Sequence, residues 1–310
     1  MIFSKTTIFC SLLFWLTIVN TAVAQQDAQY TQYMYNTISV NPAYAGSRGH
    51  TSIAAIHRSQ WVGLEGAPTT QTLNVNAPLG YNGLGIGFSV VNDKIGPTSE
   101  TNFDLDLSYT IKLSGVAKLS FGVKASANLL DIRFSELNQL SGDVTLEQDI
   151  DNRLSPNIGA GLYYYTDNSY LGISIPRFLE TSHFQETSLS VANEQMNLYL
   201  IGGYVWDLNR SWKFKPSFLT KLTEGAPLQV DISANFMYNE KFVLGAAYRL
   251  DAAVSGLFGF NLSRNMFLGV AYDHDTTALG DAAFNSGSFE LVVRYDFISI
   301  KDRIKSPRFF

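Results

Sequence analysis

The segment 101–113 alternates apolar and polar side chains with a period of two, and the segment 118–129 repeats this pattern. Such a period is typical of β-strands whose two faces meet different surroundings. Each segment is about as long as the roughly 9–11 residues that a tilted strand needs to cross a bilayer. The two segments therefore predict an antiparallel hairpin whose apolar face can meet lipid.

The loop of this hairpin decides which residues face each other. If 115–117 form the loop, Leu113 lies opposite Leu119 and Asp106 lies opposite Ser126. A slip of one residue would turn every apolar side chain to the other face. The matching faces therefore restrict the register.

Similar segments follow one another from His50 onward, with no helical pattern between them. The closing segment can pair with the first one and so remove both sheet edges, which lipid requires because each unsatisfied backbone group there costs on the order of several kcal/mol. We therefore expect about fourteen strands in one domain. They are 51–61, 69–77, 83–92, 101–113, 118–129, 156–165, 170–175, 195–206, 212–222, 229–238, 241–250, 253–262, 266–273 and 288–297.

The connections between these segments differ in length. Connections from even-numbered to odd-numbered segments are short, at 78–82, 114–117, 166–169, 207–211, 239–240 and 263–265. Those from odd to even include the long ones, at 130–155, 176–194 and 274–287, with the short 251–252 as an exception. Outer-membrane barrels have short periplasmic turns and longer outer loops. The predicted fold is therefore all-β, a transmembrane antiparallel outer-membrane β-barrel of about 14 strands in residues 50–297, with both termini periplasmic.

Aromatic residues flank three of the short turns. The pairs are Tyr165 with Tyr170, Trp206 with Trp212, and Tyr238 with Phe242. Cross-strand aromatic pairs of a soluble sheet would explain each pair singly but not their common place at short turns. The pattern favours an aromatic girdle at a membrane interface.

The N-terminus has the features of a secretory signal peptide. Residues 1–24 contain Lys5, then an apolar stretch, then the small-residue site Ala22-Val23-Ala24. The alternative is an uncleaved anchor helix. No other run of about 18 apolar residues occurs, although 46% of the 310 residues are hydrophobic, so a helical membrane protein is not expected.

Cleavage of the signal would leave 21 basic and 27 acidic residues, a net charge of −6, and no cysteine. This composition excludes disulfides and thiolate metal sites, and it gives no sign of nucleic-acid binding. Residues 25–49 then form a polar, aromatic leader on the periplasmic side, either as a cap on the barrel mouth or as a docking segment. Residues 298–310 form a C-terminal periplasmic tail.

Charged residues occupy the polar positions of the strands and are therefore expected to face the lumen. They are Asp104, Asp106, Lys112, Lys124, Lys213, Lys215, Lys221, Asp231, Arg249, Glu290, Arg294 and Asp296. An open ion-selective pore favours rings of one sign. The mixed signs favour a wall network in a plugged or narrow lumen. The alternating Gly83, Gly85 and Gly87 are expected to leave space for lumen side chains or a loop.

Catalytic and metal-binding patterns are weak. None of the four histidines has a metal-ligand spacing such as HExxH, and in Asp273-His274-Asp275 adjacent strand residues point to opposite faces. No GxSxG nucleophile elbow occurs. We therefore expect no catalytic residue, no metal and no cofactor. A barrel enzyme in which His274 and Asp273 act with a distant serine is the third alternative for the function.

Asn41 to Gly49, and the segment 58–72 with sequence RSQWVGLEGAPTTQT, resemble the PorP/SprF family of type IX secretion proteins. Weaker matches follow at 92–98, 119–122, 156–159 with 161–164, 215–217 and 306–310. The resemblance implies an outer-membrane barrel that supports export or surface attachment of a large adhesin, including adhesins of gliding motility. His57 departs from the family pattern, where we expect a tyrosine. With no peptidoglycan-binding domain after the barrel, any cell-wall link is expected from a separate protein.

We therefore expect a non-enzymatic accessory or docking subunit of the type IX secretion system. Its expected partners are outer-membrane lipid, a secreted surface adhesin, and a periplasmic ring component or a peptidoglycan-binding protein. A structured docking patch is expected at Asn41, Pro42, Gly46, Arg58, Trp61, Gly63, Glu65, Gly66 and Pro68. The connection pattern puts the Asn41 group on the periplasmic side and the Glu65 group on the outer side, so one contiguous site requires a segment to fold into the lumen. The alternative is an outer-membrane channel or transporter for small solutes, with the leader as its plug.

Overall fold

The computed structural model describes residues 28–80, 82–136, 149–179, 195–278, 280, 282 and 284–298. The expected signal peptide, residues 1–24, lies outside the described residues, as does the expected tail beyond Ile298. None of the helices in the described part of the chain is long and apolar enough to cross a membrane.

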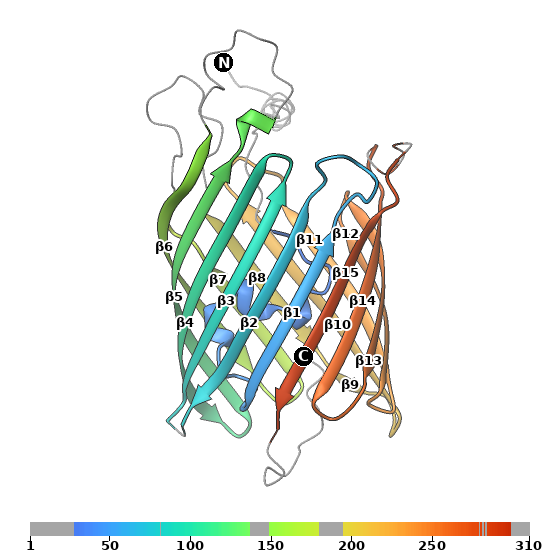
Figure 1. Ribbon diagram of the computed structural model, residues 1–310. Coiled ribbons are helices and arrows are strands. Elements are labelled where there is room, and N and C mark those ends of the chain that lie inside the picture. Colours follow the sequence, from blue (N-terminus) through green and yellow to red (C-terminus); the bar gives the residue numbers. More distant parts are fainter. Residues whose placement is uncertain are drawn as a thin grey trace, which may run out of the picture.

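The segments in which apolar and polar side chains alternate form the long strands of one antiparallel sheet (Figure 1). Short β9 continues β8, because both pair with β10 in a single register, with Gly203 opposite Ser217 and Asp207 opposite Lys213. The strands are β1 (Thr51–Ser59), β2 (Thr69–Leu79), β3 (Leu84–Ile95), β4 (Thr98–Ser114), β5 (Ala117–Ile132), β6 (Ile150–Tyr165), β7 (Ser169–Ile175), β8 (Asn197–Tyr204), β9 (Trp206–Asp207), β10 (Trp212–Thr223), β11 (Gln229–Tyr238), β12 (Phe242–Arg249), β13 (Ala253–Asn261), β14 (Met266–Asp275) and β15 (Ser288–Phe297).

The sheet closes on itself into a barrel. Each strand pairs with the next, and β15 pairs with β1 along its full length, from Ser59–Phe289 to Thr51–Phe297. Counting β8 with β9 as one strand, this confirms the prediction of a fourteen-stranded antiparallel barrel. It also confirms that the closing strand pairs with the first strand.

The two ends of the barrel differ (Figure 1). The turn end carries the β2–β3, β4–β5, β6–β7, β9–β10, β11–β12 and β13–β14 connections, the start of β1 and the end of β15. The loop end carries the others, of which β3–β4 is only the two-residue turn Gly96–Pro97. The wall is tallest at β4, β5 and β6, which have 17, 16 and 16 residues and extend it at the loop end.

The hairpin of β4 and β5 has a different register from the expected one. Asp106 lies opposite Lys124, so the expected pair with Ser126 is wrong, and so is the expected pair of Leu113 with Leu119. The turn holds two residues rather than three, and the strand bulges at Leu113. The shorter turn and the bulge each shift the pairing by one residue, and together they place opposite charges directly across from each other on the inner face.

The outer face is apolar and the inner face is polar, as the alternation predicts. Leu107 is 47% exposed on the outside, whereas Asp106 beside it is 0% exposed. Trp206 and Trp212 are also exposed at the turn end. Tyr165 and Tyr170 do not belong to an outer girdle, since they are 5% and 3% exposed and pack inside the barrel. That expectation is wrong because this part of the lumen is itself apolar.

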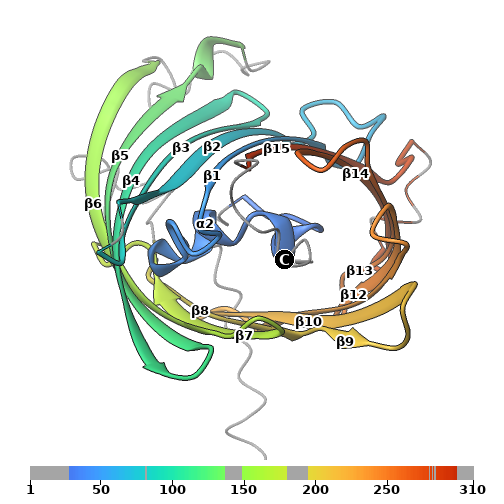
Figure 2. The same ribbon diagram turned by 90° about the horizontal axis from the view of Figure 1, so that it is seen from below.

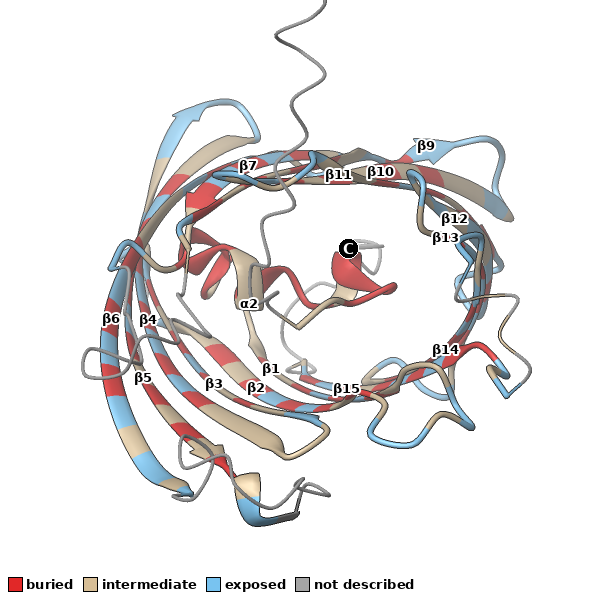
Figure 3. Cartoon of the chain, turned by 90° about the horizontal axis from the view of Figure 1, so that it is seen from above, coloured by how far each residue is buried: buried red, intermediate tan, exposed pale blue. Residues whose placement is uncertain are grey.

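The described part of the leader lies inside the barrel (Figures 2 and 3). It contains η1 (Tyr33–Tyr35), α2 (Thr37–Val40) and η2 (Pro42–Tyr44). The sequence predicts the leader as a cap on the mouth or as a docking segment; its described residues instead lie within the lumen, and we call them the plug, residues 28–49. The plug begins in the loop-end half, beside the last residues of β1 and β12, and joins β1 at the turn end.

Candidate functional site

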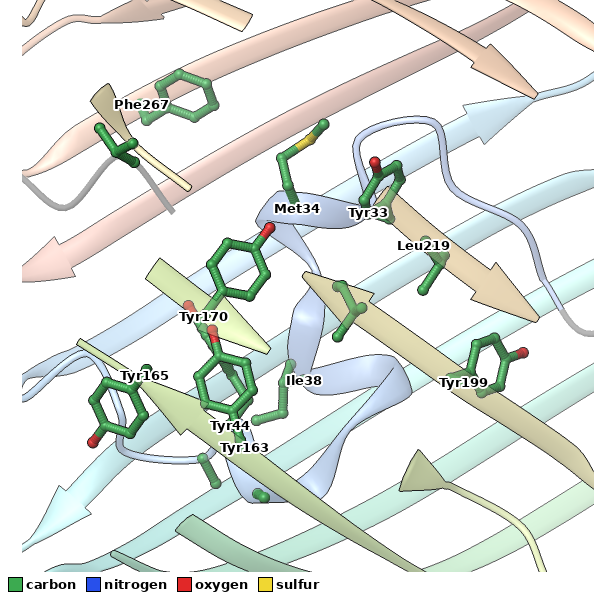
Figure 4. Close-up of a cluster of buried hydrophobic side chains, with 14 of the residues drawn as sticks. Tyr33, Met34, Ile38, Tyr44, Tyr163, Tyr165, Tyr170, Tyr199, Leu219 and Phe267 are labelled. Carbon is green, nitrogen blue, oxygen red and sulfur yellow. The ribbon is translucent and has the colours of Figure 1, made fainter. Parts of the chain in front are cut away.

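The plug and the wall share one apolar core (Figure 4). Its plug residues are Tyr33, Met34, Ile38, Ala43, Tyr44 and Ala45, and its wall residues include Tyr163, Tyr165, Tyr170, Tyr199, Leu219 and Phe267. Tyr163 packs edge-on against Tyr44, with ring centroids 5.5 Å apart. Inward aromatic side chains on β6 and β7 thus form an apolar wall for the plug. The tyrosines of these two strands are visible in the sequence and could have indicated this site. The sequence alone does not show, however, which face of each strand is turned toward the lumen.

A buried ion network holds the start of the plug at the loop end. The Arg58 guanidinium lies 2.7 Å from Asp273 and 3.3 Å from Glu290, and it donates to the Thr31 hydroxyl at 2.8 Å. The Glu290 carboxylate accepts from the backbone N–H groups of Thr31 and Gln32, at 2.8 and 2.9 Å. These five residues form the Arg58 network, and it ties three wall strands to the plug.

A second network holds the end of the plug at the turn end. The Asp296 carboxylate lies 3.0 Å from Arg48 of the plug, 3.2 Å from Arg294 and 3.3 Å from His50. The Arg294 guanidinium also stacks over the rings of Tyr35 and Phe267, 5.7 and 5.1 Å from their centroids. The plug is therefore fixed to the wall at both ends of the barrel.

Other inward charges meet opposite charges between these two networks. Lys124 lies 3.0 Å from Asp104 and 3.6 Å from Asp106, and its ammonium donates to the Ser39 carbonyl at 3.3 Å. Arg249 bonds to Asp231 and to the Gln29 side chain. Lys215 and Lys221 are buried on β10.

Two of the expected lumen lysines lie at the rim of the turn end. Lys112 is exposed beside the bulge of the β4–β5 hairpin. It has the same parity along β4 as the buried Asp104 and Asp106. Lys213 pairs with Asp207 and Glu240, at 3.6 and 3.2 Å, beside the β9–β10 turn.

The residues expected to form one docking patch fall into two groups. Asn41, Pro42 and Gly46 lie in the plug. Asn41 is 0% exposed, its side-chain oxygen accepts from the Ala43 N–H, and its amide donates to the Leu162 carbonyl. This group therefore lies inside the lumen rather than beyond the barrel mouth, with the Asn41 side chain hydrogen-bonded there.

The second group belongs to the β1–β2 connection at the loop end, residues 60–68, which we call the Trp61 loop. The Trp61 N–H donates to the Ser288 hydroxyl, and Val62 exchanges backbone hydrogen bonds with Gly287 and Ser286. Gly63 packs against the Phe284 carbonyl so closely that a Cβ would overlap it.

The rest of the Trp61 loop is anchored in the same way. The Gly66 carbonyl accepts from the Gly96 N–H and the Pro68 carbonyl from the Gln60 N–H, while Glu65 is exposed. The loop is therefore held against residues 284–288 and against the β3–β4 turn. Arg58 lies beneath it but contacts Thr31 rather than the Asn41 group, so the two groups do not form one contiguous patch.

A small cavity of about 60 Å³ remains between the plug and the wall, and it opens toward the loop end. Its charged lining residues are Asp93, Glu100, Asp104, Lys124 and Arg177. Because a buried water needs roughly 10–15 Å³ of such space, the cavity holds a few water molecules rather than a solute.

Asp273 and His274, which the sequence offers as a candidate pair, do not face a common site. Asp273 is buried against Arg58, whereas the neighbouring His274 points outward and is exposed. Within 28–298, apart from the undescribed segments, no three His, Cys, Asp or Glu side chains are grouped to hold a metal ion.

The barrel is similar in fold to solved barrel structures. The toluene transporter TbuX of Ralstonia pickettii is 10% identical, with 84% of this chain and 92% of that chain covered and a TM-score of 0.50. Omp33 of Acinetobacter baumannii is 9% identical, with 80% and 99% covered and a TM-score of 0.46. At such identities the likeness concerns the fold alone. No curated protein matches the chain.

A family model described as the type IX secretion system membrane protein PorP/SprF matches residues 22–295. This range includes the plug, the Trp61 loop and all strands but the last two residues of β15. The chain therefore belongs to the PorP/SprF family of type IX secretion system membrane proteins.

Proposed function

We propose that this chain is a non-enzymatic accessory subunit of type IX secretion that docks a large secreted adhesin at the outer membrane. The observation that carries this proposal is the filled lumen: the plug is bonded at both ends and leaves a cavity of about 60 Å³ beside it. A barrel that is filled in this way offers binding surfaces rather than a path for solutes.

The proposed docking surface for the adhesin is the Trp61 loop together with Phe284. Phe284 is 75% exposed and Val62 is 37% exposed, on two connections that backbone hydrogen bonds hold together. A rigid surface loses little conformational entropy on binding. More of the free energy gained by burying its apolar side chains therefore appears as affinity. In this proposal the loop end faces outward and the turn end faces the periplasm, as in other outer-membrane barrels.

The turn end is the proposed place for contact with a periplasmic ring component or a separate peptidoglycan-binding protein. Both chain termini would then be periplasmic. Whether the adhesin serves gliding motility or attachment alone depends on the client, which the barrel does not specify.

The proposal is tested in a strain that lacks this protein. One large surface protein should disappear from the cell surface, while the other type IX substrates are still exported, and complementation should restore it. Loss of every type IX substrate would indicate a core role, and loss of none would end the secretion proposal.

The docking surface has its own test in the complemented strain. We expect the double variant Val62→Ser with Phe284→Ser to reduce display of the client, while the folded barrel is inserted at normal levels. Leu250→Ser is the matched control, because Leu250 is 48% exposed on a different loop-end connection. An equal loss of display in both strains would contradict this surface.

A further inference from the structure

A strip of glycines crosses the inner wall from β3 to β7 and faces the plug. The glycines are Gly85, Gly87, Gly122, Gly161 and Gly172. A Cβ at Gly122 would overlap the main chain at Pro42 and Ala43, and one at Gly85 would overlap the Ala45 carbonyl. The expected role of Gly85 and Gly87, space for an approaching loop, is confirmed.

The other glycines of the strip leave space for side chains of the plug. A Cβ at Gly87 would lie 2.5 Å from the Ile38 side chain, and Cβ atoms at Gly161 and Gly172 would press on the Asn41 amide. Close approach of one backbone to another is a known reason for glycine within a strand. The wall is therefore hollowed along the path that residues 38–46 follow.

Side chains beside this strip bind the main chain of the plug. The Ser108 hydroxyl donates to the Ala45 carbonyl and the Ser174 hydroxyl donates to the Val40 carbonyl, both at 2.7 Å. The Lys124 ammonium donates to the Ser39 carbonyl at 3.3 Å. These bonds satisfy carbonyls that helix ends leave without partners. The wall thus recognises a backbone path as well as side chains.

Residues 39–46 are joined to the wall covalently only through the short segment that leads into β1. Gly49 lies in this segment, is exposed, and has nothing within 4 Å of the place of a Cβ. All described contacts of residues 39–46 with the glycine strip are non-covalent. A cut beside Gly49 would therefore leave these contacts in place.

We propose that the glycine strip with Ser108, Lys124 and Ser174 is a peptide-binding groove. Its resident ligand is the chain's own segment 39–46, SVNPAYAG, and the groove also binds this peptide when it is a separate molecule. The ligand class is a short peptide with small residues in the turn around Asn41-Pro42-Ala43. This binding does not depend on adhesin docking, and either proposal can fail without the other.

The test uses the full chain with a protease site inserted between Gly49 and His50. After cleavage of the folded protein in detergent, we expect the N-terminal fragment to stay bound at one copy per barrel. An excess of a labelled synthetic peptide of residues 28–49 should then replace it. Loss of the fragment on cleavage would overturn the proposal, and so would a retained fragment that never exchanges.

Variant peptides show whether the groove selects the ligand, and they leave the barrel unchanged. Ala43→Val enlarges a side chain that is 0% exposed, at the residue whose main chain lies against Gly122, and should weaken competition about tenfold or more. Val40→Leu is the matched control, because Val40 borders the small cavity and has room for one more methylene. Equal competition by both variant peptides would show that the glycine strip does not discriminate between peptide sequences and would overturn the proposal.

Discussion

Arg58 is the residue on which the loop-end network depends. Its guanidinium is 2% exposed and meets two carboxylates and one hydroxyl, so the network keeps one net negative charge even with Arg58 present. The Glu290 carboxylate also accepts two backbone N–H groups, which compensates part of that charge. Because charges are costly to bury without partners, the arginine cannot be removed alone without a large penalty.

We expect Arg58→Met to destabilise the barrel by about 3–5 kcal/mol, because two carboxylates then remain buried without their cation. The free energy of unfolding in urea, followed by tryptophan fluorescence, measures this. Arg264→Met, an exposed arginine in the β13–β14 turn, is the control and should change stability by less than about 0.5 kcal/mol. Similar effects of both substitutions would contradict the assigned role of Arg58.

Tyr35 gives a prediction about pH. Burial raises the pKa of the Tyr35 phenol to about 12, although Arg294 acts in the opposite direction. The neutral Tyr35 phenol is therefore favoured in the folded state. Its contribution to the free energy of unfolding is complete below about pH 10, the pKa of a tyrosine in the unfolded chain, and is lost as the pH rises from there toward 12.

We therefore expect the Tyr35→Phe variant to resist alkali better than the unchanged protein. At about pH 8 the two unfolding free energies should be close, and at about pH 11 the variant should gain on the order of 1 kcal/mol relative to the parent. Urea unfolding at both pH values measures the difference. Parallel pH curves would contradict a raised Tyr35 pKa.

At the scale of elements, the Trp61 loop and the 284–288 segment stabilise each other. Gly63 has φ +106° and packs against the Phe284 carbonyl, so a side chain there meets both backbone strain and a collision. Gly80 also has positive φ, +67°, but nothing lies within 4 Å of the place of its Cβ. A substitution at Gly80 therefore introduces backbone strain alone, whereas one at Gly63 introduces both strain and a steric collision.

Gly63→Ala should accordingly free the amides of residues 60–68 and 284–288 to exchange hydrogen at least about tenfold faster, because their mutual hydrogen bonds break. Gly80→Ala introduces only the strain of a positive φ, without a collision, and should leave hydrogen exchange in these segments unchanged. Hydrogen exchange followed by mass spectrometry measures both. Unchanged exchange in the Gly63 variant would show that the contact is not needed.

The strands could be predicted from the sequence because each alternates with a period of two, and even β7, which has seven residues, follows this pattern. Register depends on the turn and on the bulge beside it: the two-residue β4–β5 turn shifts the pairing by one residue and the bulge at Leu113 by one more, so Asp106 lies opposite Lys124 rather than Ser126. Tyr165 was assigned to the wrong face because β6 carries tyrosines on both faces near its end. Alternation alone cannot decide between an inner and an outer aromatic residue when the lumen itself is filled.

At the scale of the whole molecule, the plug joins the two ends of the barrel. It is bonded through Thr31 to the Arg58 network at the loop end and through Arg48 to Asp296 at the turn end. The sequence marked Asn41 to Gly49 as a distinct motif but gave no sign of its place, because its partners are more than 50 residues away along the chain. Glycines in β3, β5, β6 and β7 could have located it, since each leaves space on the same wall.

A filled lumen should block the passage of ions, and the electrical conductance of the purified full chain in a planar lipid bilayer measures this. We expect no steady conductance from inserted barrels, because the plug packs against the wall inside the lumen and is fixed at both ends. Stable, solute-selective conductance of the unchanged protein without secretion partners would contradict a filled lumen and would support the transporter alternative.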